Sequence, residues 1–396
     1  AALVAGCGGS AAAPSASTPS SPAAAAKPAG SSAGAAPSAA TGSASGVAAS
    51  PSGSAAATGA EASSSPEASA SNAAANAPAS AGQTLNVPVA VQGSISDLPI
   101  YLAIDRGYFK AQGLNVEVQR FNTITDEVAP LATGQLMAGV GGVSSGLFNA
   151  ASRGIALQIV ADRSYTPPDF KGTGFAVRKD LLDSGKVKEP KDIKGLTFGM
   201  GSTGSVIDTE LELLLSKGGL TRNDVTLKQL SYGDQVAAFA NKSIDVAYTF
   251  EPFLSAMQSK GLADLWMPSG QLVPNHEQSV IVYGPEFVKN PAAANGWMVA
   301  YIKGIRDYVA AYANGTPPDD VVATMAKFTN QDPNIVRALK PSPVNPDGAL
   351  NPTSLKLDLD EFVKLGLVNN PPPLDKVMNS SHVDAAVKQL GKYQAK

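Results

Sequence analysis

Residues 195–219 restrict the possible folds of this chain more than any other stretch. A short apolar run is followed by a loop of glycine and hydroxyl residues, and apolar residues then recur at helical spacing over residues 207–215. Ser205 stands where a helix N-cap is expected, and Gly218 where a left-handed glycine would end the helix. The stretch therefore predicts a strand, a loop and a helix in that order.

The loop at residues 201–205 is expected to lie over the N-terminus of this helix, where free backbone N–H groups favour a polar or anionic ligand. It overlaps a Gly-x-Gly-x-x-Gly motif that begins at Gly199. A dinucleotide site also requires an acidic residue at the end of the next strand. Asp224 stands before that strand, so we expect no cofactor, and either a small ligand on the loop or a glycine turn without one.

The same pattern recurs along residues 84–396. Predicted strands are 85–91, 116–118, 136–140, 155–160, 175–177, 196–200, 225–230 and 244–248, with an extended return segment at 280–283. Only helices are predicted beyond it, at 291–313, 318–329, 333–339, 357–365 and 383–390. Thr125 is expected to cap the helix after the second strand. Alternating strands and helices predict parallel sheets, whose ligands bind beyond the carboxyl ends of the strands.

Residues 8–83 differ sharply from the rest because they consist almost wholly of Ala, Ser, Pro and Gly. Such a segment lacks the large apolar side chains that offset the entropy of ordering, which predicts a disordered linker. It starts after residues 3–7, Leu-Val-Ala-Gly-Cys, which resemble the lipobox of a bacterial lipoprotein. We therefore expect a lipid on Cys7, a membrane contact through that lipid, and a linker that holds a globular part clear of the surface.

Composition limits the remaining possibilities. Cys7 is the only cysteine, so the chain forms no internal disulfide and no cysteine-based metal site. A formal charge of -3 gives no basic surface for nucleic acid. His276 and His382 are the only histidines, and we expect both to be surface or helix-capping residues and not metal ligands.

Several stretches of the globular part match one family in order. They are residues 99–118 (PIYLAIDRGYFKAQGLNVEV), 131–135 (LATGQ), 176–180 (AVRKD), 192–198 (DIKGLTF), 201–204 (GSTG), 245–247 (DVA), 251–253 (EPF) and the closing helix at 383–391. Together they resemble periplasmic substrate-binding proteins of the nitrate, sulfonate, taurine and thiamine-pyrimidine type, which serve ABC importers.

The resemblance implies an α/β fold of two lobes that close on a ligand about a hinge, the type II periplasmic-binding-protein fold. Lobe 1 would comprise residues 84–168 and 279–396, and lobe 2 residues 169–278. It also implies a monomer that binds a small molecule and contacts an ABC permease and its ATPase. The ligand would be a small organic anion or polar heterocycle of the sulfonate, nitrate, aromatic acid or pyrimidine class.

The expected ligand-binding residues lie where strands end and helices begin. They are Ser94, Ser96, Asp97, Thr123, Gly142, Val143, Ser144, Arg163, Ser202, Thr203, Thr249 and Glu251. Most offer hydroxyl or backbone donors. Arg163 could pair with an anionic head group or be a surface charge, and Glu251 could accept from a ligand amine or cap a helix.

Two enzyme alternatives remain. Gly142-x-Ser144-x-Gly146 matches the nucleophile-elbow pattern of serine hydrolases, although no His-Gly-Gly oxyanion segment accompanies it. A pyrimidine-synthesising enzyme of the same fold is the other alternative. The lipobox and the long linker favour the binding protein, so we expect a lipid-anchored protein outside the cytoplasm that is not an enzyme. A sensory or adhesive lipoprotein that uses the same clamp without transport is a third possibility.

Overall fold

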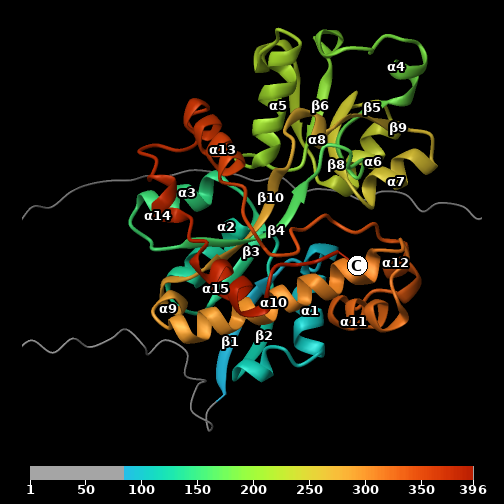
Figure 1. Cartoon of the computed structure of the whole chain (residues 1–396). Coiled ribbons are helices and arrows are strands. Elements are labelled where there is room, and N and C mark those ends of the chain that lie inside the picture. The colour runs from blue at the N-terminus through green and yellow to red at the C-terminus, as the bar shows by residue number, and fades with distance from the viewer. Residues whose placement is uncertain (1–83, 396) are drawn as a thin grey trace, which may run out of the picture. The chain divides into compact units, whose positions relative to one another are not determined.

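The computed structural model describes residues 84–395 (Figure 1). The predicted lipobox with Cys7 and the predicted linker at 8–83 lie outside the described residues. Over residues 84–395 the chain alternates strands and helices, as the sequence predicts, and builds two five-stranded sheets.

The first sheet has the strand order β2-β1-β3-β10-β4. Its strands are β1 (Leu85–Val91), β2 (Leu114–Arg120), β3 (Ala138–Gly142), β4 (Gln158–Thr166) and β10 (His276–Tyr283). β1 runs parallel to both β2 and β3, but β10 is antiparallel to its neighbours β3 and β4. The expectation of wholly parallel sheets is therefore wrong, because the chain returns from the second sheet to insert β10 between β3 and β4.

The second sheet has the order β7-β6-β8-β5-β9. Its strands are β5 (Thr173–Arg178), β6 (Thr197–Met200), β7 (Thr226–Gln229), β8 (Val246–Phe250) and β9 (Ala263–Pro268). β6 is parallel to β7 and β8, whereas β5 is antiparallel to β8 and β9. β9 was not predicted from the sequence.

Helices follow most of the strands and then make up the C-terminal part. They are α1 (Leu98–Asp105), α2 (Ile124–Ala132), α3 (Ser145–Ser152), α4 (Lys179–Asp183), α5 (Val206–Lys217), α6 (Tyr232–Ala240), α7 (Phe253–Ser259), α8 (Ser269–Leu272), α9 (Pro285–Val288), α10 (Pro291–Tyr312), α11 (Asp319–Thr329), α12 (Pro333–Ala338), α13 (Pro352–Lys364), α14 (Leu374–Val377) and α15 (Ser381–Leu390). Short 3₁₀ turns are η1 (Ile95–Asp97), η2 (Lys110–Gln112), η3 (Pro190–Ile193) and η4 (Arg222–Asp224). No strand follows β10 in the described part of the chain, which confirms the predicted helical C-terminal part.

Helix ends follow local side-chain chemistry, with two corrections to the sequence predictions. Ser205 caps α5 as predicted, but the left-handed residue after α5 is Gly219, at φ +66°, and not Gly218. Thr123, and not Thr125, caps α2, because its side chain accepts a hydrogen bond from the backbone of Asp126. The capping residue therefore starts α2 two residues earlier than expected.

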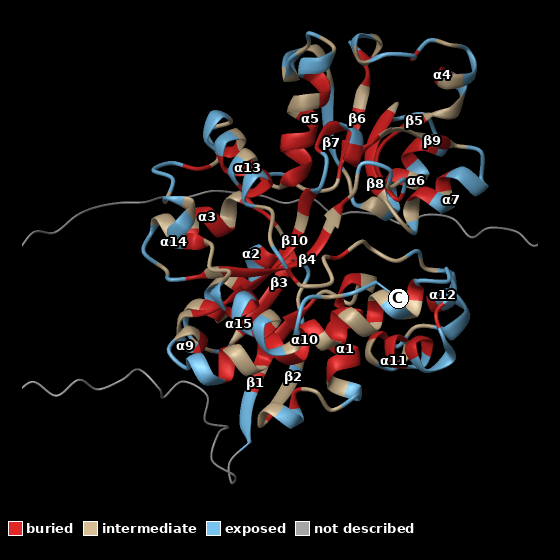
Figure 2. Cartoon of the chain, viewed as in Figure 1, coloured by how far each residue is buried: buried red, intermediate tan, exposed pale blue. Residues whose placement is uncertain are grey.

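Helix α10 packs in one hydrophobic core with α1 and the first sheet. Figure 2 shows that buried residues run along α10 and α1 and through both sheets. Trp297 and Tyr301 are fully buried, and a side chain at Gly304 would lie 2.1 Å from the carbonyl oxygen of Pro99 in α1. Gly304 therefore permits the close packing of α10 on α1.

The two sheets are connected by crossings of the chain. One crossing leaves β4 for β5, and a second leads from α8 into β10. A third segment, residues 340–351 between α12 and α13, lies along β4 and β10; we call it the strap. The N–H of Asp162 in β4 donates to the carbonyl of Gly348, and that of Tyr165 donates to the carbonyl of Pro343; each N···O distance is 3.0 Å.

Candidate ligand-binding site

Two loops from different sheets meet directly. Ser144, after β3, and Ser205, after β6, form an antiparallel bridge. The N–H of Ser145 donates to the carbonyl of Gly204 over 2.8 Å, and that of Val206 to the carbonyl of Val143 over 3.3 Å. The structure therefore brings the predicted residues Val143 and Ser144 against the 201–205 loop, although more than 50 residues separate them in the chain.

The 201–205 loop is held by its own helix. Asp208, in the first turn of α5, accepts hydrogen bonds from the N–H groups of Gly204 and Ser205, at N···O distances of 2.6 and 3.2 Å. Its other carboxylate oxygen is paired with Arg222 at 2.7 Å. The hydroxyls of Ser202 and Ser205 lie 3.0 Å apart. Two N–H groups at this helix N-terminus are thus already satisfied by a carboxylate, which leaves less positive potential for an anion than the sequence suggests.

An aromatic ring covers the start of this loop. A side chain at Gly201 would lie 2.2 Å from Cζ of Tyr232. The Tyr232 ring packs edge-on against Phe250, with ring centroids 4.5 Å apart. Only glycine at position 201 leaves room for the ring. Tyr232 and Phe250 are therefore placed as an aromatic wall beside Ser202, while Thr203 is exposed.

Two of the predicted hydroxyl residues are buried without a partner. Ser144 is 8 % exposed, and its hydroxyl oxygen has no hydrogen bond within the described part of the chain. Thr249, at the end of β8, is fully buried, and its hydroxyl likewise has none there. Buried hydroxyls are normally hydrogen bonded, so these two groups have hydrogen-bonding capacity that the described residues do not use.

Arg163 is a structural cation in this structure. It is 4 % exposed in β4 and is paired with the fully buried Asp97, from Nη2 to Oδ1 at 2.8 Å. Its guanidinium also donates to the hydroxyls of Ser94 and Ser279, at N···O distances of 2.8 and 2.7 Å. The second Asp97 oxygen accepts from the N–H groups of Gln92 and Ser94. The pair therefore fixes the β1–α1 loop, and each charge is neutralised by the other.

Ser96 is buried beside Asp97 in η1. Gly142 pairs with Ser279 in the first sheet. Thr123 is exposed, and its hydroxyl lies 2.9 Å from Asp126 of its own helix. Within residues 84–395, no hydrogen bond joins Thr123 to the loops that contain Ser144 and Ser205.

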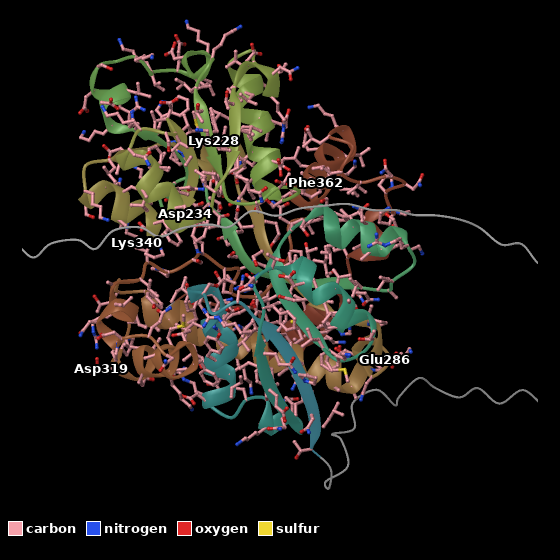
Figure 3. All side chains as sticks on the ribbon, turned by 180° about the vertical axis from the view of Figure 1, so that it is seen from behind. Lys228, Asp234, Glu286, Asp319, Lys340 and Phe362 are labelled. Atoms are coloured by element: carbon pink, nitrogen blue, oxygen red, sulfur yellow. The ribbon has the colours of Figure 1, made fainter. Side chains whose placement is uncertain are left out.

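Glu251 connects the second sheet to the strap. One oxygen of its carboxylate pairs with Lys340, and the other accepts from the N–H of Ser255 over 3.1 Å. Figure 3 shows Lys340 on the chain that lies between the parts carrying Asp234 and Asp319. The Lys340 contact was missed because no local pattern marks a lysine in an irregular segment 89 residues away.

Both histidines differ from the prediction of surface or capping residues. His276 is fully buried, with Nδ1 2.9 Å from Glu210 and Nε2 3.0 Å from Asp358. Burial lowers the pKa of His276, but Asp358 and Glu210 outweigh it and raise the pKa to about 10. His382 is 6 % exposed with Nδ1 2.6 Å from Asn295, and burial lowers its pKa.

No contact joins Ser144 to either histidine within the described residues. Among the same residues, no group of three or more His, Cys, Asp or Glu side chains is arranged to hold a metal ion. No helix there is both long and apolar enough to cross a membrane.

A family model described as NMT1/THI5 like matches residues 95–314, more than half of the chain. The chain belongs to the NMT1/THI5-like family. The matched residues of this NMT1/THI5-like chain include both meeting loops, the Arg163–Asp97 pair and Glu251. The strap and α13 lie beyond them.

Comparisons with other proteins agree with this family. A protein of Brucella abortus strain 2308 that is named as a binding protein is 27 % identical over 256 residues, 62 % of this chain and 73 % of the relative. The nitrate-binding protein NrtA of Synechocystis has a similar fold, with a TM-score of 0.62, 14 % identity, and coverage of 80 % of this chain and 90 % of NrtA.

The aliphatic sulphonate binding protein SsuA of Escherichia coli gives a TM-score of 0.60 at 17 % identity, covering 78 % of this chain and 95 % of SsuA. The desulfurization enzyme DSZB shares the fold at a TM-score of 0.53 and 13 % identity, covering 77 % and 99 %. The two-sheet α/β fold expected from the sequence is thereby confirmed, and it occurs both in binding proteins and in an enzyme.

Proposed function

We propose that this chain is the substrate-binding protein of an ABC importer, which captures a small molecule between the loops of its two sheets and delivers it to the permease. The observation that carries the proposal is the direct bridge between Ser144 and Ser205, which joins the carboxyl-end loops of the two sheets. Ligands of open α/β sheets bind at such ends. The proposal is also supported by the similar fold of a nitrate-binding protein and a sulphonate-binding protein.

The ligand that fits is a small organic anion or a polar heterocycle of the sulfonate, nitrate, aromatic acid or pyrimidine class. The unpartnered hydroxyls of Ser144 and Thr249 supply hydrogen bonds, and the ring of Tyr232 supplies an aromatic wall. The charges of Arg163 and Glu251 are already paired, so we assign them to fixing loops, and the hydroxyls to ligand contact.

The remaining parts of the proposal concern location and assembly. We propose a monomer outside the cytoplasm, anchored by a lipid on Cys7, with lobe 1 formed by residues 84–168 and 279–396 and lobe 2 by 169–278. Changing Cys7 to alanine should move the protein from the membrane fraction to the soluble fraction. Unchanged fractionation would contradict the anchor without affecting the binding function.

A thermal-shift screen of the full chain tests the binding function. The probes are taurine, nitrate, benzoate, an aminopyrimidine and riboflavin, because a ligand that binds only the folded state raises the melting temperature. We expect one class to raise it, and expect Ser144→Ala to weaken that shift. Ser216→Ala is the matched control, since Ser216 is an exposed serine of α5.

The enzyme alternative rests on two observations, the DSZB fold and the buried hydroxyl of Ser144. We propose binding instead because Ser144 lacks the histidine partner that activates a serine nucleophile. Esterase turnover that disappears in Ser144→Ala, together with no melting shift for any probe, would favour the hydrolase.

A further inference from the structure

Helix α13 joins the two sheets on one side of the molecule. The sequence assigns it to lobe 1, but it shares one hydrophobic core with α3, which follows β3 of the first sheet, and with α5, which follows β6 of the second sheet. The residues of these helices in that core include Leu147 and Phe148 of α3, Leu211 and Leu214 of α5, and Leu355, Leu359 and Phe362 of α13. An apolar core therefore continues from one sheet to the other through α13.

Buried polar groups hold α13 in the same place. The ring of His276, at the start of β10, lies between Glu210 of α5 and Asp358 of α13, at 2.9 and 3.0 Å, and all three side chains are fully buried. The pKa of about 10 keeps the His276 ring charged at neutral pH. Separating α13 from α5 would leave a buried charge without its partner, which is strongly unfavourable.

The attachment extends from α13 to α3. The rings of Phe148 and Phe362 lie 6.2 Å apart between centroids. The side-chain amide of Asn149 donates to the carbonyl of Leu367, just after α13, at an N···O distance of 2.8 Å. We call α13, with its contacts to α3 and α5, the brace.

The side that carries the strap is held much more weakly. Lys340 of the strap pairs with Glu251, which follows β8, and the Lys340 side chain is 56 % exposed. Within residues 84–395, no other hydrogen bond or ion pair joins residues 173–268 to residues 285–350. The apolar cluster of α6 and α7 is also separate from that of α1, α10 and α11. Figure 3 shows Phe362 and Lys340 on opposite sides of the segments that join the two sheets.

The unequal strength of the two sides determines which of them can open. An exposed ion pair contributes little, whereas parting the brace would expose a shared apolar core and break a buried ionic network. We propose that the brace keeps the two sheets together along α3 and α5, and that the sheets separate only on the strap side, where Lys340 and Glu251 form the closing contact. Entry of a ligand from the strap side rests on the proposed function; the unequal opening does not.

Distances between spin labels on the full chain, measured without ligand by double electron–electron resonance, test the unequal opening. All variants carry Cys7→Ser, because Cys7 is the only cysteine. One label pair spans the strap side, at Ser259→Cys in α7 and Ala338→Cys in α12, and both positions are exposed.

Two further label pairs span the brace. They join Val363→Cys in α13 to Lys217→Cys in α5 and to Arg153→Cys directly after α3, and all three positions are exposed. These pairs report whether α13 stays in place relative to each of the two helices.

Lys340→Glu is the decisive variant, because it places a negative charge opposite Glu251. The fraction of long distances across the strap side should rise about twofold to thirtyfold, the range given by losing one exposed attraction and gaining a repulsion of similar size. The two brace distances should stay as in the wild type. Lys356→Glu reverses another exposed lysine, on α13, and should change none of the distances. An unchanged strap-side distribution in Lys340→Glu, or an equal change across the brace, would overturn the proposal.

Phe362→Ala tests whether the brace itself holds the sheets together. It removes the ring that packs on Phe148, so both brace distances should broaden. Asp358→Asn, which removes the charge that faces His276, is used if the first variant does not fold. Brace distances as narrow as those of the wild type in either folded variant would also overturn the proposal.

Discussion

The N–H of Ser145 donates to the carbonyl of Gly204 over 2.8 Å, so that the first helix residue after β3 is bonded to the loop after β6. A side chain at Gly204 would lie 2.4 Å from the hydroxyl of Ser145, and its φ is +73°. Contact between the two loops thus depends on a glycine.

Gly204→Ala should weaken ligand binding about fivefold, since a hydrogen bond across the loops contributes ~1 kcal/mol. Gly219→Ala is the matched control, because Gly219 has φ +66° and no atom within 4 Å of the added carbon. Both variants should lose about 1–2 kcal/mol of stability from the left-handed backbone. Calorimetric titration with the ligand found in the screen separates them, and equal affinities for the two variants would contradict the role of the loop contact.

Asp97→Asn should destabilise the protein by roughly 3–5 kcal/mol, because it leaves the buried Arg163 without its counter-charge. Urea denaturation measures the loss. The control, Asp360→Asn, breaks an exposed pair with Lys356 and should cost about 1 kcal/mol or less. An equal loss of stability in the two variants would contradict a stabilising role for the buried pair of Arg163 and Asp97.

His276→Gln should make stability less dependent on pH. The pKa of His276 is raised from 6.5 to about 10, so its charged form stabilises the fold fully below pH 6.5, and this contribution is lost as the pH rises through about 10. Wild-type stability should therefore fall between these values, measured by urea denaturation at several pH values. The variant should be less stable at pH 6.5 and show a shallower fall; a parallel pH profile would disprove the assignment.

Lys340→Ala should weaken ligand affinity about 1.4-fold to fivefold, since exposed ion pairs contribute ~0.2–1 kcal/mol. The pair with Glu251 is the contact through which the strap reaches the second sheet. The melting temperature without ligand should stay close to that of the wild type. Lys356→Ala removes another exposed lysine pair, on α13, and should leave affinity unchanged. An affinity loss shared by both variants would indicate a general charge effect.

Local signals in the sequence predicted the elements that carry the meeting loops. Ser205 and the glycines before it mark a strand, a loop and a helix, because caps and turns depend on neighbouring residues. The insertion of β10 between β3 and β4, and the existence of β9, were not predictable in this way. They depend on strand pairing between distant segments, which leaves no local pattern.

The ion pairs show the same limit at the level of side chains. Arg163 and Asp97 are 66 residues apart, and His276 lies 66 and 82 residues from Glu210 and Asp358. A charged or titratable residue in a loop reads as exposed until the residues that bury and pair it are known. Arg163, which the sequence placed where the fourth strand ends, lies within β4 instead, and its pairing with Asp97 emerged only from the tertiary structure.

Recovery of the bound compound tests the central claim most directly. The full chain is incubated at equal concentration with the compound that gives the largest melting shift, and both the stoichiometry by calorimetry and the chemical identity of the recovered compound are determined. The account predicts one molecule bound for each chain, recovered unchanged. A chemically altered product, or no binding of any probe, would contradict a substrate-binding protein.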